Sequence, residues 1–155
     1  MDRHLDNFRV LLVLALGTLA IALYVTFNAP PPGPDVQALY DWQGYGAVTS
    51  GFADYYLFWI EVGLYAIALS TMFFYWRYAR HILLVAIFLS PLRAVLGGIW
   101  VSSPLEDAFW AFHSIFVLLV AGMALFHPPV RAAFSRELSV RGSPPNTSFE
   151  RTREG

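Results

Sequence analysis

Three ionisable side chains lie inside long apolar stretches of the sequence, where a charge is costly: Glu61, Arg93 and His113. Each lies about eight residues from the expected outer end of its stretch, or roughly 12 Å below the membrane surface at about 1.5 Å per residue. An unpaired charge at this depth costs several kcal/mol, so each side chain should face the inside of a helix bundle. The economical arrangement pairs Glu61 with Arg93, while His113 donates or accepts a hydrogen bond from a third side. We call these three residues the intramembrane layer and expect them to share one depth.

Further residues extend the intramembrane layer. Asp54 precedes Glu61 by seven residues and should share its helix face nearer the outside, whereas Tyr65 should lie one turn deeper. Glu106 and Asp107 stand at the start of the fourth apolar stretch, so the outer rim becomes acidic. A cation or proton arriving from outside would meet this rim first. Alternatively, the rim acids are solvated helix starts, a position that acids favour because of the helix dipole.

Other chemistry is excluded or weakly indicated. The sequence has no cysteine, which excludes disulfides and thiolate chemistry, and all ten basic residues are arginine, which excludes lysine Schiff bases. His4, His81 and His127 fall near one membrane interface, and His81 with His127 could ligate a haem from adjacent helices. Interfacial histidines more often cap helix ends, so we expect no metal, no cofactor and no catalytic residue.

The elements that must position these residues are membrane-spanning helices. The chain is 57% hydrophobic and 14% charged, with a mean hydropathy of +0.51, a balance that suits a bilayer rather than a soluble domain. An all-α integral membrane four-helix bundle is therefore predicted, with an outer loop at 28–52. The four spans are expected at about 10–27, 53–76, 81–101 and 105–127. The first span is longer than a signal-peptide core and lacks a small-residue cleavage site, so we expect it to be retained.

Arginine placement predicts the orientation. Arginines precede the first span, lie in the turn between the second and third spans, and follow the fourth span: Arg3, Arg9, Arg77, Arg80, Arg131, Arg136 and Arg141. The loops at 28–52 and 102–106 contain no arginine. The positive-inside rule then places residues 1–9 and 128–155 in the cytoplasm. The polar composition of the tail predicts disorder beyond a short juxtamembrane helix.

The sequence resembles known proteins in two respects. The order of segments resembles that of small four-helix bacterial inner-membrane proteins of unknown function. It consists of one span, a long outer loop, a two-span hairpin whose second span follows Phe73-Phe74-Tyr75-Trp76-Arg77, and a fourth span. This likeness covers about residues 5–135 and carries no functional residue with it. Residues 143–153 resemble the read-through tail of integron gene-cassette products. That likeness implies a bacterial, horizontally mobile gene.

The sequence favours a non-enzymatic multi-pass protein of the bacterial inner membrane. In this interpretation the intramembrane layer organises the bundle and offers a site for a small polar ligand or a partner helix. One alternative is a proton-linked transporter or channel subunit, acting as a homo-oligomer or with a partner membrane protein, because four short helices enclose little pathway. Another is an enzyme acting on a lipid with His113 or Glu61 as base. The expected partner is the lipid bilayer, and no nucleic-acid partner is expected.

Overall fold

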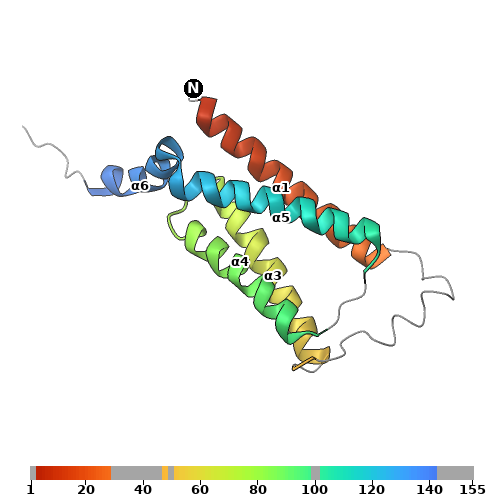
Figure 1. The fold of residues 1–155 in the computed structure, drawn as a ribbon. Helices are drawn as coiled ribbons and strands as arrows, with labels where there is room; N and C mark the ends of the chain where they lie inside the picture. Colours follow the sequence, from red (N-terminus) through yellow and green to blue (C-terminus); the bar gives the residue numbers. More distant parts are fainter. Residues whose placement is uncertain (1–2, 29–46, 49–50, 99–101, 143–155) are drawn as a thin grey trace, which may run out of the picture.

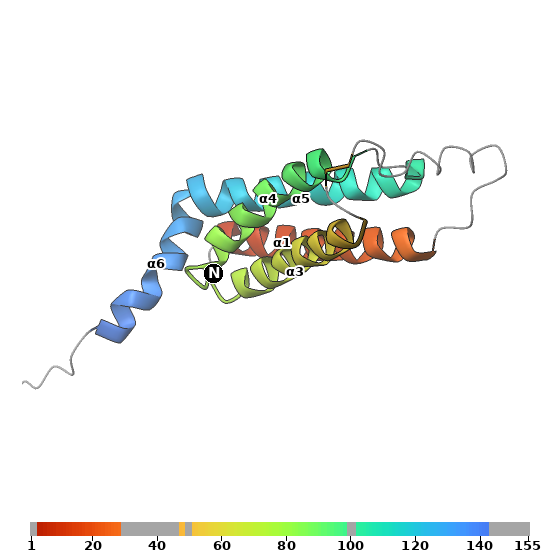
Figure 2. The ribbon, with the colours of Figure 1, turned by 90° about the horizontal axis from the view of Figure 1, so that it is seen from below.

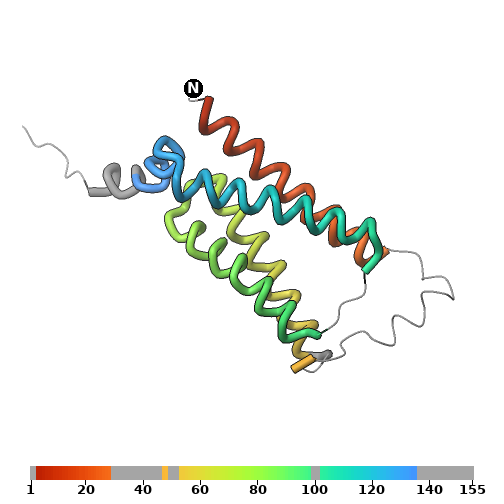
Figure 3. The backbone as a smooth tube through the Cα atoms, viewed as in Figure 1, coloured from red at the N-terminus to blue at the C-terminus, as the bar shows by residue number. Residues whose placement is uncertain are grey.

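The computed structural model describes residues 3–28, 47–48, 51–98 and 102–142, and these form five helices. Their bounds are α1 Arg3–Asn28, α3 Gly51–Met72, α4 Ala79–Leu96, α5 Pro104–Phe126 and α6 Pro128–Gly142. The described part of the chain contains no strand, and α1, α3, α4 and α5 are long and apolar enough to cross a membrane. The predicted all-helical fold with four candidate spans is therefore confirmed. Figure 3 traces this path from α1 to α6.

The helices associate as two pairs. The most extensive contacts join α1 to α5 and α3 to α4, and the contacts between the two pairs are fewer. The pairs lie against each other near α6 and separate toward the C-terminal ends of α1 and α4 (Figure 1). Seen from below, the two pairs overlap (Figure 2). The bundle is thus two antiparallel pairs rather than four equivalent helices.

The apolar core lies toward the α6 end of the bundle. It is formed by buried residues of all five helices: Phe8, Leu12, Ala15, Leu19, Tyr65, Ala68, Leu69, Met72, Ala79, Leu83, Ala86, Val117, Val120, Ala121, Ala124, Val130 and Phe134. Asp54, Arg93, Glu106 and Asp107 lie toward the other end, near the starts of α3 and α5 and the end of α4, whereas Glu61 and His113 lie near the middle of their helices. Packing therefore holds the pairs together at one end and leaves the other end to polar contacts.

The α3–α4 connection begins earlier than predicted, because α3 ends at Met72 rather than at residue 76. The Tyr75 N–H donates to Met72 O and the Trp76 N–H donates to Thr71 O, while Tyr75 has a φ of 52°. These features define a Schellman-type helix end. Tyrosine in this left-handed conformation costs about 1 kcal/mol, so contacts of its ring must hold it there.

The other boundaries follow local capping. The fourth apolar helix begins at Pro104, and the Ser103 side chain caps it by accepting from the Glu106 N–H at 3.1 Å. Helix α4 ends at Leu96, before Gly97 and Gly98, rather than at residue 101. Residues 99–101 lie outside the described residues.

Residues 128–155, predicted to be a largely disordered tail, begin with a helix. Helix α6 covers Pro128–Gly142, and Val130 and Phe134 are buried against the bundle. Phe134 packs edge-on against Phe8 of α1 and Tyr75 of the α3–α4 turn, with ring centroids 6.1 and 5.4 Å away. The start of the tail is therefore part of the folded domain. Residues 143–155 and most of the 28–52 loop lie outside the described residues.

Candidate functional site

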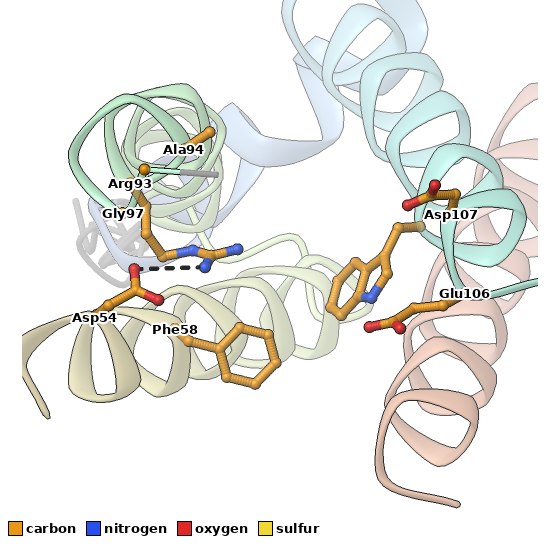
Figure 4. Close-up of a pocket in the computed structure, with 9 residues that line it drawn as sticks. Asp54, Phe58, Arg93, Ala94, Gly97, Glu106 and Asp107 are labelled. Carbon is orange, nitrogen blue, oxygen red and sulfur yellow. Dashed lines mark ion pairs between the residues drawn. The ribbon is translucent and has the colours of Figure 1, made fainter. Parts of the chain in front are cut away.

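Arg93 connects the two acidic residues predicted to share one face of α3. Its Nε donates to Oε2 of Glu61 at 2.8 Å, and its Nη1 lies 3.7 Å from Oδ1 of Asp54. Figure 4 shows the contact with Asp54. The expected Glu61–Arg93 pair is present, and the seven-residue spacing places Asp54 on the same side of α3. One guanidinium thus serves two carboxylates.

Gly97 allows Asp54 to approach the end of α4. A Cβ added at Gly97 would lie 2.8 Å from Asp54 Oδ1 and 3.1 Å from the Arg93 carbonyl oxygen. Carbon does not approach oxygen this closely without a shift, so any larger residue would displace the Asp54 carboxylate. The glycine that ends α4 therefore also fixes the acidic side chain.

The predicted third member of the intramembrane layer does not join the ion pair. Nδ1 of His113 lies 3.1 Å from the Ala15 carbonyl oxygen of α1, and its Nε2 has no hydrogen-bond partner in the described structure. The ring lies between Tyr65 and Trp110, with centroid distances of 5.1 and 5.9 Å. The reason is helix pairing: α5 packs chiefly on α1, which turns His113 away from α4.

Tyr65 lies deeper than the ion pair, as its spacing predicts. Its side chain is 7% exposed, and its hydroxyl is within hydrogen-bonding range of Ser90 on α4. With His113 it connects α3, α4, α5 and α1 at one level. This level is a packed joint between the two helix pairs and does not face the cavity described below.

Glu106 belongs to a second polar network that sequence reasoning missed. Its side chain is 7% exposed, and Oε1 accepts a hydrogen bond of 2.9 Å from the Thr26 hydroxyl of α1. Thr26 in turn accepts from Trp110 Nε1 at 3.2 Å. Two sequence features could have indicated this network: Thr26 is a polar residue inside the first apolar span, and Trp110 follows Glu106 by one helical turn.

The three rim acids therefore differ. Asp54 and Glu106 are largely buried, in contrast to the solvated helix starts considered above, whereas Asp107 is exposed and accepts a hydrogen bond from Ser102. Asp54 Oδ1 is buried without a hydrogen-bond donor, since its only described contact is the longer ion pair. A buried carboxylate oxygen in this condition is an acceptor left for a further donor.

A cavity of about 260 Å³ lies between the α3–α4 pair and α5, and we call it the outer pocket. It is lined by Asp54, Phe58, Arg93, Ala94, Gly97, Gly98, Glu106, Asp107 and Trp110. In Figure 4, Phe58 from α3 and Glu106 from α5 extend into this space from opposite sides. Glu61 pairs with Arg93 at its deep edge, and neither His113 nor Tyr65 lines it.

The outer pocket carries an excess of negative charge. Three carboxylates and one guanidinium line it, and the guanidinium is already neutralised by Glu61 and Asp54. Arg93 also lies over the Phe58 ring, with its Cζ 5.3 Å from the centroid. Glu106 and Asp107 face the cavity with no cation of their own among the described residues. The site can therefore accept a positive charge.

A haem or metal centre finds no support in the histidines. The pair considered as a haem alternative was His81 with His127, but the ring near His127 is that of His4, with centroids 4.9 Å apart. Among the residues that the structure describes, no group of three or more His, Asp or Glu side chains could hold a metal ion.

The sequence and the fold were compared with protein-family models, with curated proteins and with solved structures. None of the three comparisons found a match. The function proposed below therefore depends on the residues of the outer pocket.

Proposed function

We propose that this protein is a multi-pass protein of the bacterial inner membrane that binds a small organic cation, an ammonium compound, in its outer pocket. One observation carries the proposal: Glu106 is 7% exposed and lines a cavity in which Arg93, the one cation among its described lining residues, is already paired with Glu61 and Asp54. A buried carboxylate is costly unless a positive charge or donors compensate it. A bound cation would supply that charge.

Glu106 is the residue expected to bind the cation directly. Thr26 holds one of its oxygens at 2.9 Å, and Trp110 holds Thr26, so the carboxylate is fixed before any ligand arrives. A pre-positioned charge loses little conformational freedom on binding, which favours affinity. Asp54 also lines the cavity and provides a second carboxylate across it.

The aromatic side chains favour an ammonium group over a metal ion. Trp110 and Phe58 line the cavity with their ring centroids 6.0 Å apart. Arg93 already occupies the vicinity of Phe58, so Trp110 is the ring left to contact a ligand. An ammonium ion beside a tryptophan and a carboxylate combines cation–π attraction with charge pairing.

The orientation is part of the proposal. We place both termini and the α3–α4 turn in the cytoplasm because the arginines cluster at that end, and the outer pocket then opens on the other side of the membrane. The integron-like tail supports a bacterial source. In this position the site would sample cations outside the cell.

A second candidate, a proton-linked carrier, is favoured by one observation. The outer pocket lies between two helix pairs that share fewer contacts with each other than within each pair. Rocking of one pair against the other is a common route to alternating access. The lipid-enzyme alternative has less support, because His113 is 2% exposed and Glu61 is tied to Arg93.

Thermal unfolding of the purified full chain, with tetramethylammonium chloride as the probe, tests the proposal. Binding should raise the unfolding temperature with concentration, by an amount equivalent to about 2.7 kcal/mol at a hundredfold excess over Kd. Sodium chloride at the same concentration controls for salt. The Glu106→Gln variant should lose the shift, whereas Asp6→Asn, an acid of α1 outside the pocket, should keep it. Equal shifts in both salts, or an undiminished shift in the glutamine variant, would exclude this function.

A further inference from the structure

An open groove lies between α1 and α3 at the end of the bundle opposite the outer pocket. It measures about 550 Å³ and is lined by Arg9, Leu16, Ser70, Phe73 and Phe74. Phe74 is 77% exposed, and Ser70 and Arg9 are exposed as well. In a membrane this surface faces lipid rather than water, so we name it the lipid-side groove.

The lipid-side groove carries its one charged residue near the end of α3 and runs along α1 from there. Arg9 and Leu16 are seven residues apart on α1, which corresponds to roughly 10 Å of helix rise. Phe73 and Phe74 follow the last residue of α3, beside the membrane interface, and Ser70 lies one turn inside it. The groove therefore offers a guanidinium and two phenylalanine rings at its interfacial end, and Leu16 with the Ser70 hydroxyl farther along the helices.

Arg9 is held at the groove and has no counterion among the described residues. Its Cζ lies 5.7 Å from the ring centroid of Tyr75, the residue in the left-handed conformation at the end of α3. Tyr75 is fixed in turn by Phe8 and Phe134. Arg9 makes no ion pair with any residue that the structure describes. A positioned, unpaired guanidinium at an interface is a binding point for a phosphate.

The surrounding charge favours an anionic occupant. Among the residues at this end whose side chains the structure describes, the only acid is Asp6, whereas five are arginines: Arg3, Arg9, Arg77, Arg80 and Arg131. Such a basic end attracts anionic phospholipids of the cytoplasmic leaflet. Charge thus complements the shape of the groove.

We infer that the lipid-side groove is a specific site for one anionic glycerophospholipid, with the phosphate on Arg9 and an acyl chain along Leu16, Phe73 and Phe74. This site is independent of the outer pocket, since it lies at the other end of the helices and shares no lining residue with it. A lipid bound here would bridge α1 and α3, which belong to different helix pairs. It would thereby stabilise the contact between the pairs.

Native mass spectrometry of the full chain in maltoside detergent can count the bound lipid. The probes are phosphatidylglycerol and phosphatidylcholine with the same acyl chains. The wild type should retain one phosphatidylglycerol in preference to phosphatidylcholine. Arg9→Gln should weaken this binding about fivefold or more, as expected for the loss of one arginine at an anionic headgroup. Arg131→Gln, an exposed arginine of α6 outside the groove, should leave it unchanged.

A second variant tests the apolar part of the site. Leu16→Trp should fill the groove and reduce binding of phosphatidylglycerol although Arg9 is still present, whereas added inorganic phosphate should not compete at millimolar concentration. Equal retention of both lipids by the wild type, equal loss in Arg9→Gln and Arg131→Gln, or competition by free phosphate would each overturn the inference. None of these results bears on tetramethylammonium binding in the outer pocket.

Discussion

Arg93 Nε donates a hydrogen bond of 2.8 Å to Oε2 of Glu61, and the same guanidinium lies 3.7 Å from Asp54 Oδ1 through Nη1. The two carboxylates come from one helix, and the arginine comes from its partner in the α3–α4 pair. The two contacts are unequal, because only the shorter one is a hydrogen bond. Loss of Arg93 would leave both acids uncompensated, whereas loss of either acid would leave Arg93 with the other.

This asymmetry predicts an order of stability among three variants. Arg93→Gln should be the least stable, by about 3 kcal/mol relative to wild type, since it leaves two largely buried carboxylates without the cation that pairs with both. Glu61→Gln should cost less, and Asp54→Asn should cost least because its contact is longer. Thermal unfolding of the detergent-extracted proteins measures the order.

The double variant Glu61→Gln with Arg93→Gln provides the control for this order. It should recover part of the stability lost in Arg93→Gln but not all of it, because Asp54 remains without its cation. Equal stability of the two single variants would contradict the shared role of Arg93. Full recovery in the double variant would show that Asp54 contributes nothing.

The sequence predicts one half of this site well. Segment lengths and hydropathy give the four spans, and a charge inside an apolar helix requires a partner, which leads to Glu61 and Arg93. The spacing of seven residues adds Asp54 on the same face. These inferences succeed because each depends on helix geometry within one segment or on the cost of an isolated charge.

The other half depends on how the helices pair, which periodicity does not encode. His113 was expected beside Glu61 and Arg93 but contacts Ala15 of α1, because α5 pairs with α1. Glu106 looks like an ordinary first-turn acid until Thr26, 80 positions away in the sequence, is placed beside it. The end of α3 at Met72 depends on the Tyr75 conformation, for which an aromatic run gives no local signal.

Gly97→Ala should impair ligand binding more than folding. The added methyl would lie 2.8 Å from Asp54 Oδ1, and the carboxylate can move away at modest cost because it is the end of a side chain. We therefore expect a fall in unfolding free energy of about 1 kcal/mol or less and a clearly weaker response to tetramethylammonium. The unfolding temperature with and without tetramethylammonium measures both effects.

Gly122→Ala is the matched control for this substitution. Nothing lies within 4 Å of a Cβ added at Gly122 in α5, so alanine should be neutral or slightly stabilising there through its helix propensity. An unchanged tetramethylammonium response in Gly97→Ala would mean that the position of Asp54 does not matter for binding.

Thr26→Val should loosen the α1–α5 pair at the outer pocket. Valine is similar in shape but cannot donate to Glu106 or accept from Trp110, so two hydrogen bonds of 2.9 and 3.2 Å are lost. We expect a loss of about 1–2 kcal/mol in unfolding free energy and a shift in tryptophan fluorescence. Thr18→Val is the control, because the Thr18 hydroxyl bonds only to carbonyls of its own helix. A larger effect at position 18 would refute the role given to Thr26.

The proposed orientation can be tested by labelling, because the chain has no cysteine of its own. Val48 is 79% exposed and its N–H bonds to the Leu96 carbonyl at the outer end of α4, whereas the exposed Ser135 lies on α6. A membrane-impermeant maleimide added to intact spheroplasts should label Val48→Cys and should label Ser135→Cys only after lysis. The opposite pattern would reverse the orientation and place the outer pocket in the cytoplasm.

Phe134→Ala should show whether α6 is an integral part of the bundle. Phe134 is 1% exposed and contacts Phe8, Tyr75 and the guanidinium of Arg80, which lies 5.1 Å from its ring centroid. Removing a buried phenylalanine ring costs about 3 kcal/mol, and here it would also release the ring that helps to hold Tyr75 in its left-handed conformation. Phe126→Ala, which removes a ring that is 81% exposed, should be close to neutral. If thermal unfolding finds the two variants equally stable, α6 is not docked in solution, and the tail acts as an independent extension of the four-helix domain.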